Sequence, residues 1–131
     1  MSTSNDVQDA LARLARERTV RLVTRGRKSG RPREVTIWFV VDDGSIGLGT
    51  LDASRNWVRN ARAAGEVELV FGDERLRGRF RDVSADPAAH ERIRRGMARK
   101  YWPAWIASWL GIGQRSTFRV ESLERVDATR S

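Results

Sequence analysis

The sequence contains no cysteine, one histidine and three prolines in 131 residues. Without cysteine, the chain has no disulfide, no thiolate metal ligand and no cysteine nucleophile. No hydrophobic run approaches the ~20 residues of a membrane-spanning helix, and residues 1–6 are too polar for a signal peptide. These absences predict a cytoplasmic protein with a single domain over residues 1–131.

Residues for acid–base or metal chemistry are also scarce. The lone His90 stands beside Glu91 in a helix that we expect to be exposed, and Asp42-Asp43 is typical of a turn. The sequence holds no H-E-x-x-H pattern, no clustered metal ligands and no nucleophile elbow. We therefore predict no metal site and assign no catalytic residue, and an enzyme built on this chain would depend on a bound cofactor.

Positive charge is abundant by comparison. Lys and Arg total 25 against 17 acidic residues, a formal net charge of +8, and only two of the 25 are lysines. Such a balance suits nucleic acid, an anionic membrane surface or a small anionic ligand, and it is also found in arginine-rich proteomes without any such partner. Because the guanidinium fork grips phosphate and carboxylate in a bidentate manner, the distribution of the arginines matters more than their sum.

The hydrophobic pattern predicts short strands joined by turns, with three helices among them. This predicts a mainly β, α+β fold, an antiparallel barrel of about six strands with flanking helices. Residues 1–17 would form an N-terminal helix and residues 18–124 the barrel core. The near-continuous apolar stretch Glu34–Val41 predicts burial on both faces. The expected helices are Asp6–Arg18, Ser54–Ala64 and Asp86 towards Lys100, and the expected strands are Thr19–Thr24, Glu34–Val41, Ser45–Thr50, Glu66–Phe71, Arg75–Val83 and Ser116–Leu123.

Three segments are candidates for a site, and each has an ordinary structural explanation. The basic loop T-R-G-R-K-S-G-R-P-R over residues 24–33 suits an anion or is simply solvated. The helix over residues 55–60 (R-N-W-V-R-N) suits a ligand contact or an ordinary surface helix. The aromatic residues at 101, 102, 105 and 109 suit a ligand slot or core packing.

Taken together, these segments resemble a known family. The basic loop, the strand E-V-T-I-W-F-V-V, the turn D-D-G, the strand ending in Thr50 and the helix W-V-R-N are similar to the deazaflavin (F420)-dependent nitroreductase and quinone reductase family. That family belongs to the flavin/deazaflavin oxidoreductases of split β-barrel fold. The similarity covers roughly residues 18 to 124, and the G-R-K-S-G-x-x-R element gains specificity from the W-x-x-N helix.

The resemblance implies a cofactor site and a substrate wall. The cofactor would be F420, with FMN as the alternative, and the basic loop would hold its phosphate and acidic tail. Tyr101, Trp105 and Trp109 would line the substrate pocket. The cofactor-binding residues implied are Arg27, Lys28, Ser29, Gly30 and Arg33 in the loop, Thr36, Ile37 and Trp38 along the ring-binding strand, Thr50 near the ring, and Trp57 and Asn60 on the helix.

The function implied is hydride transfer from reduced F420 to a small acceptor, such as a quinone, a nitro compound or an activated alkene. The alternative is a non-catalytic protein of the same fold that binds or carries F420, FMN or haem. A nucleic-acid binder using the Arg75–Arg81 strand is a third hypothesis, but the aromatics do not interleave with the basic strands, so we expect no nucleic acid. A homodimer and peripheral contact with an anionic membrane are compatible with the resemblance.

Overall fold

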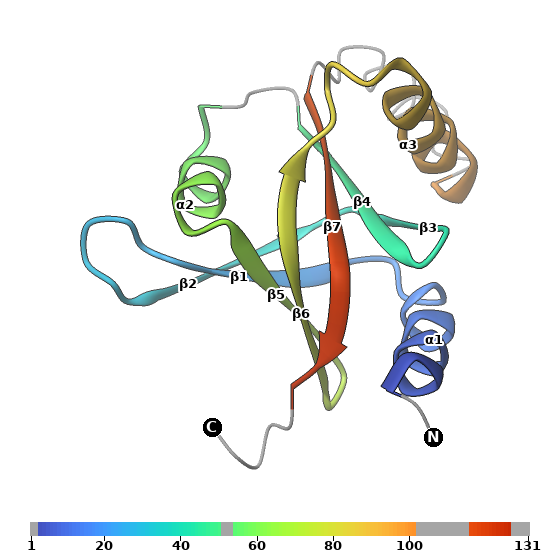
Figure 1. The fold of residues 1–131 in the computed structure, drawn as a ribbon, viewed down its shortest axis with the longest axis horizontal. Coiled ribbons are helices and arrows are strands. Elements are labelled where there is room, and N and C mark those ends of the chain that lie inside the picture. The colour runs from blue at the N-terminus through green and yellow to red at the C-terminus, as the bar shows by residue number, and fades with distance from the viewer. Residues whose placement is uncertain (1–2, 51–53, 102–115, 127–131) are drawn as a thin grey trace.

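The computed structural model describes residues 3–50, 54–101 and 116–126, which form seven strands and three helices (Figure 1). No helix in this part of the chain is long and apolar enough to cross a membrane. In chain order the elements are α1 (Thr3–Leu14), β1 (Val20–Arg25), β2 (Pro32–Ile37), β3 (Val40–Asp42), β4 (Ser45–Thr50), α2 (Asn56–Ala64), β5 (Glu66–Phe71), β6 (Glu74–Asp82), α3 (Pro87–Lys100) and β7 (Ser116–Arg125).

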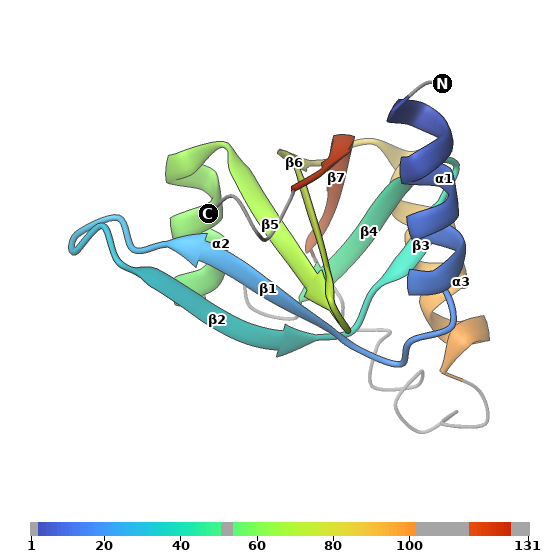
Figure 2. The ribbon, with the colours of Figure 1, turned by 90° about the horizontal axis from the view of Figure 1, so that it is seen from below.

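The described strands form one antiparallel sheet in the order β2-β1-β5-β6-β7-β4-β3. Its two edge strands, β2 and β3, follow each other in the chain and are joined only by Trp38 and Phe39. A sheet whose opposite edges are two residues apart must curl, and Figures 1 and 2 show the resulting split barrel. The predicted fold class, a mainly β split barrel with flanking helices, is confirmed.

The stretch Glu34–Val41 departs from its prediction. It is not one strand: β2 ends at Ile37 and β3 begins at Val40, which raises the strand count from about six to seven. The predicted burial on both faces is also wrong, because four of the six residues of β2 are exposed. Val35 and Ile37 of β2 pack against the core, whereas Glu34 and Thr36 alternate with them on the opposite face and are exposed.

The core lies inside the curled sheet, where two helices complete it. Leu11 and Leu14 from α1 and Val58 and Ala61 from α2 are buried in the same cluster as inward residues of the strands. The first helix spans Thr3–Leu14 instead of the expected Asp6–Arg18, and Ala15 is exposed. Hydrogen bonds of the 3₁₀ type, such as that from the Glu17 N–H to the Leu14 carbonyl three residues earlier, end the helix before the chain enters β1.

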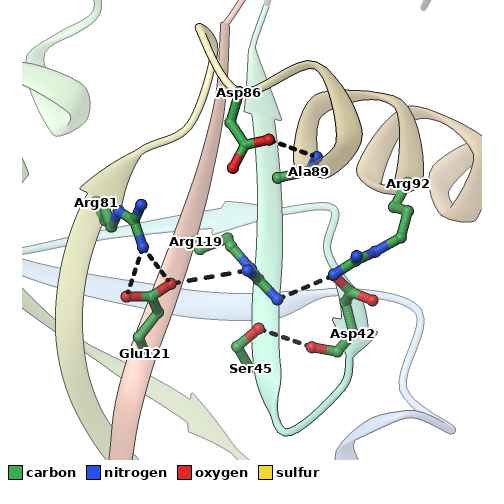
Figure 3. A network of polar contacts seen from close by, with 8 residues as sticks. All are labelled: Asp42, Ser45, Arg81, Asp86, Ala89, Arg92, Arg119 and Glu121. Atoms are coloured by element: carbon green, nitrogen blue, oxygen red, sulfur yellow. Dashed lines mark hydrogen bonds and ion pairs between the residues drawn. The ribbon is translucent and has the colours of Figure 1, made fainter.

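Helix α3 covers β3 and β4 from outside the barrel, over a separate apolar cluster that includes Ile93 and Met97. A chain of ion pairs runs from this helix across the sheet (Figure 3). Asp42 of β3 accepts from Arg92 of α3 at 2.9 Å and from Arg119 of β7 at 3.2 Å. Arg119 in turn lies 3.8 Å from Glu121, which also pairs with Arg81 of β6 at 3.1 Å.

The sequence predicted an exposed His90, but the side chain, on α3, is half-buried. Its Nδ1 lies 3.0 Å from the hydroxyl of Thr117, which is itself fully buried in β7. The predicted start of this helix is confirmed, since the carboxylate of Asp86 accepts from the Ala89 N–H at 3.2 Å. The first turn of α3 is therefore tied to the sheet through His90.

Candidate functional site

A pocket of about 550 Å³ lies between the β1–β2 loop and the start of α2. The end of β1, the loop, the first half of β2 and α2 all contribute to it. Six of the predicted cofactor-binding residues are among its lining residues, which are Thr24, Gly26, Arg27, Lys28, Ser29, Arg33, Glu34, Val35, Arg55, Asn56, Trp57 and Asn60.

The loop between β1 and β2 is held in shape by its own hydrogen bonds. The Gly26 N–H donates to the Arg31 carbonyl and the Gly30 N–H to the Gly26 carbonyl, both at 2.8 Å. Gly30 has a φ of +73°, and a Cβ on Gly26 would lie 2.8 Å from the Ser29 hydroxyl oxygen, so both positions favour glycine. The glycines therefore allow a compact turn, which the Arg25 guanidinium also holds by donating to the Gly30 carbonyl at 2.7 Å.

Helix α2 holds the loop through Asn60. The Oδ1 atom of this buried residue accepts from the backbone N–H of Arg27 at 3.2 Å and from its guanidinium at 2.8 Å. One turn earlier, the half-buried indole of Trp57 packs edge-on against Phe80 and Phe118. The W-x-x-N spacing thus places one residue in the core and one on the loop, while both line the pocket.

The cations of the pocket have no acidic partners in the described part of the chain. Arg27, Lys28, Arg33 and Arg55 line the pocket, and none of them makes an ion pair with a described residue. The one acidic lining residue, Glu34, lies 3.7 Å from Arg21. Four cations without a described ion-pair partner, against one carboxylate in the lining, make a positive site that suits a ligand with several negative charges.

Two further features of the lining suit a phosphate. The hydroxyl of Thr24 is buried and has no hydrogen-bond partner among the described residues. Helix α2 begins at the pocket, and its N-cap residue, Arg55, makes no side-chain capping bond. A free hydroxyl and an uncapped helix start both favour an anionic oxygen, so the donor set fits a ligand that carries phosphate and carboxylate groups.

The other predicted cofactor residues lie outside this lining. Gly30 belongs to the same loop, while Ile37 is half-buried against the core and Thr36 is exposed. Trp38 is 40% exposed and stands beyond the end of β2. Thr50 is buried at the end of β4, next to residues 51–53, which are outside the described residues.

Of the three predicted substrate-pocket residues, only Tyr101 is described, and it lies in the core. Its side chain is 1% exposed and its hydroxyl contacts main-chain atoms of Arg18 and Phe39. Burial raises the pKa of this hydroxyl above its usual value. Trp105 and Trp109 lie outside the described residues.

Several lining residues were not among those predicted to bind the cofactor. Arg55 and Asn56 precede Trp57 directly in the helix that was singled out, and Thr24 opens the basic loop. Nothing in the sequence shows that the Thr24 hydroxyl is buried without a partner, because that depends on how α2 packs over β1. The sequence therefore indicated the two segments that form the pocket, but it did not identify Thr24, Arg55 or Asn56 as lining residues.

A model of the F420H(2)-dependent quinone reductase family matches residues 3–120 of the chain. No curated protein matches the sequence of this chain.

Solved structures share the fold at low sequence identity. The conserved hypothetical protein Rv2991 from Mycobacterium tuberculosis has a TM-score of 0.67 and 20% identity, over 97% of this chain and 85% of that protein. An F420-H2 dependent reductase (FDR-A) has a TM-score of 0.60 and 21% identity, over 80% and 95% of the two chains. The haem storage protein HutZ from Vibrio cholerae has a TM-score of 0.63 and 16% identity, over 95% and 96%.

Proposed function

The chain belongs to the F420H(2)-dependent quinone reductase family, a family of oxidoreductases, and we propose that it transfers a hydride from reduced F420 to a small acceptor. The acceptor classes that we propose are quinones, nitro compounds and activated alkenes. The observation that carries the proposal is the pocket between the β1–β2 loop and α2, with its four cations that lack acidic partners among the described residues. F420 and FMN both carry a phosphate and a tricyclic ring, and the acidic tail of F420 is the part that such a pocket senses.

The loop and α2 would bind the phosphate and the acidic tail. Arg27, Lys28 and Arg33 supply charged donors, and the hydrogen bonds from Arg27 to Asn60 fix one of them before any ligand arrives. A donor that is already held in place loses little freedom on binding, which raises affinity. The hydroxyls of Ser29 and Thr24 would add neutral hydrogen bonds.

The ring would lie against the end of β2. In this proposal the main chain of Thr36, Ile37 and Trp38 contacts the ring edge and Thr50 lies near the ring. The protein's part in the reaction is then to orient the ring and the acceptor and to exclude water. We assign no acid–base residue, so the proton comes from solvent.

The first experiment is equilibrium binding of F420 and of FMN to the purified protein, followed by quenching of tryptophan fluorescence. Trp57 lines the pocket and provides a local signal. We expect F420 to bind in the micromolar range or tighter, and FMN to bind at least about tenfold more weakly, a difference of about 1.4 kcal/mol. Binding of neither compound would refute the proposal, and tighter binding of FMN would replace the cofactor.

Turnover separates the reductase from a carrier of F420, FMN or haem. The haem storage protein of similar fold makes the carrier a natural comparison. Reduced F420 bound to the protein should be oxidised rapidly by members of a quinone panel, as followed by the return of the visible absorption of F420. Tight binding without oxidation by any acceptor would favour the carrier.

Two further partners, a second copy of the chain and an anionic membrane surface, remain predictions. A homodimer is tested by light scattering, and contact with an anionic membrane by co-sedimentation with vesicles that contain acidic lipids. The unpaired cations of the pocket supply a positive surface for such vesicles. Nucleic acid is not expected, because three of the β6 arginines are already paired with carboxylates.

A further inference from the structure

The two-residue junction between β2 and β3 has no strand partner. Pairing of β1 with β2 ends at Val20 and Ile37, and pairing of β3 with β4 begins at Val40 and Gly47. Phe39 is nevertheless fully buried. Buried main-chain N–H and C=O groups need hydrogen-bond partners, so another part of the molecule must supply them here.

Tyr101 supplies these partners from the end of α3. The Phe39 N–H donates to its hydroxyl oxygen at 3.0 Å. The hydroxyl itself faces the carbonyl oxygens of Arg18 at 2.7 Å and Phe39 at 3.1 Å, which are the acceptors for its single proton. One buried hydroxyl therefore ties three segments together: the entry to β1, the junction and the end of α3.

The aromatic rings at the junction are held as well. Trp38 stacks on Tyr101 with ring centroids 4.1 Å apart and an angle of 9° between the planes. The guanidinium of Arg18 lies over the Tyr101 ring at 5.0 Å, and the Nζ of Lys100 lies 3.3 Å from the centroid of Phe39. Such cation–π contacts restrict both rings, so side-chain packing reinforces the hydrogen bonds.

From this geometry we propose that Tyr101 is a positioning residue, which fixes the end of β2 and thereby the orientation of the cofactor ring. The inference rests on the proposed function, in which the main chain of residues 36–38 contacts that ring. It gives Tyr101 a different role from the substrate wall that the sequence predicted. The tail would be held separately by the β1–β2 loop, at the opposite end of β2.

The Tyr101→Phe variant tests this, because it keeps the ring and its stacking on Trp38 but removes the hydroxyl. We expect the Kd of F420 to change by less than about threefold, since the loop still holds the tail. The visible circular dichroism of bound F420, which reports ring orientation, should change. The kcat with a saturating quinone should fall at least about tenfold, because small misplacements of reacting groups cost large factors in rate.

A control variant separates positioning from loss of stability. Ile93→Val shortens a fully buried side chain of the same helix, about two turns before Tyr101 and in the same apolar cluster, but leaves the hydrogen bonds of the Tyr101 hydroxyl in place. It should lower Tm by a few degrees without changing the circular dichroism of bound F420 or kcat. Equal spectral changes in both variants would overturn the proposal.

Two other outcomes would also overturn it. One is a Tyr101→Phe protein that has a lower Tm but an unchanged spectrum and kcat, which would make the hydroxyl purely structural while the proposed function stands. The other is a wild-type protein that does not bind F420, which removes both proposals together. If Tyr101→Phe does not fold, Arg18→Met takes its place, because it removes the guanidinium over the Tyr101 ring at 5.0 Å and leaves residues 36–38 unchanged, and a change in the same direction in the spectrum is expected.

Discussion

Two basic regions of the molecule, strand β6 and the β1–β2 loop, have opposite electrostatic surroundings. The arginines of β6 face carboxylates on neighbouring strands: Arg75 pairs with Glu68, Arg77 with Glu124 at 3.5 Å, and Arg81 with Glu121 at 3.1 Å. The cations of the β1–β2 loop have no such partners in the described part of the chain. Charge that looks equivalent in the sequence is neutralised in one region and left available in the other.

Sheet geometry explains the difference. Across the β5–β6 pairing, Glu68 stands opposite Arg77 and Glu66 opposite Arg79, so acidic and basic side chains share one face. The loop projects beyond the last pair of β1 and β2, Arg25 with Pro32, and no described strand pairs with it. The comparison teaches that the ligand is indicated by where cations lack partners, and not by the net charge of +8.

The largest expected effect comes from neutralising the loop. Arg27→Gln combined with Lys28→Gln should weaken F420 binding by at least about 2 kcal/mol, about 30-fold, because two charge-assisted contacts are lost. The fluorescence titration measures it. Arg77→Gln with Arg81→Gln is the matched control, since it changes net charge equally, and its affinity should stay within about threefold of wild type. An equal loss of F420 affinity in both variants would show that the loop cations have no special role in binding.

A smaller effect involves Lys100, a half-buried cation whose Nζ has no hydrogen-bond partner among the described residues. Burial, together with the charge of Arg18 and against the opposing effect of Glu17, lowers its pKa from 10.5 to about 8. Between pH 8 and 10 the folded protein loses this proton while the unfolded chain keeps it, so the free energy of unfolding should rise with pH. After solvent screening we expect about 1 kcal/mol, measured by urea unfolding.

Lys100→Met should abolish that rise between pH 8 and 10. The window ends there because the pKa of Tyr101 is raised by burial, and its retained proton lowers stability at higher pH. A wild-type stability that falls from pH 8 to 10, or a rise that persists in Lys100→Met, would contradict the assignment to Lys100.

The smallest effect comes from releasing the paired arginines. Glu121→Gln with Glu124→Gln should change the free energy of unfolding by less than about 1 kcal/mol, because Glu124 is exposed, Glu121 is part-exposed, and Arg119 keeps its ion pair with Asp42. Retention on a heparin column should nevertheless increase, since Arg77 and Arg81 become available. Glu66→Gln with Asp73→Asn removes equal charge from carboxylates that make no ion pair with a described residue. Equal retention of the two variants would show that the pairing does not shield the arginines.

Much of the site could be predicted because its parts are local in sequence. The basic loop and the W-x-x-N helix each lie within ten residues, and together they contain the six lining residues that were predicted to bind the cofactor. Thr24 could not be predicted, because its free hydroxyl depends on the packing of α2 over β1. The proposed positioning role of Tyr101 could not be predicted either, because its hydroxyl contacts residues 62 and 83 positions away in the sequence.

Most local elements, and the family, could be predicted from the residues alone. Turns with a positive φ, as at Asp43-Gly44 and Gly65, mark where strands and helices end, and alternation predicted the two faces of β6. The break of the apolar run 34–41 into two edge strands, and the set of arginines without an ion-pair partner in the described part of the chain, follow from long-range packing. Both depend on the curl of the sheet, which brings distant strands together and leaves the β1–β2 loop beyond their reach.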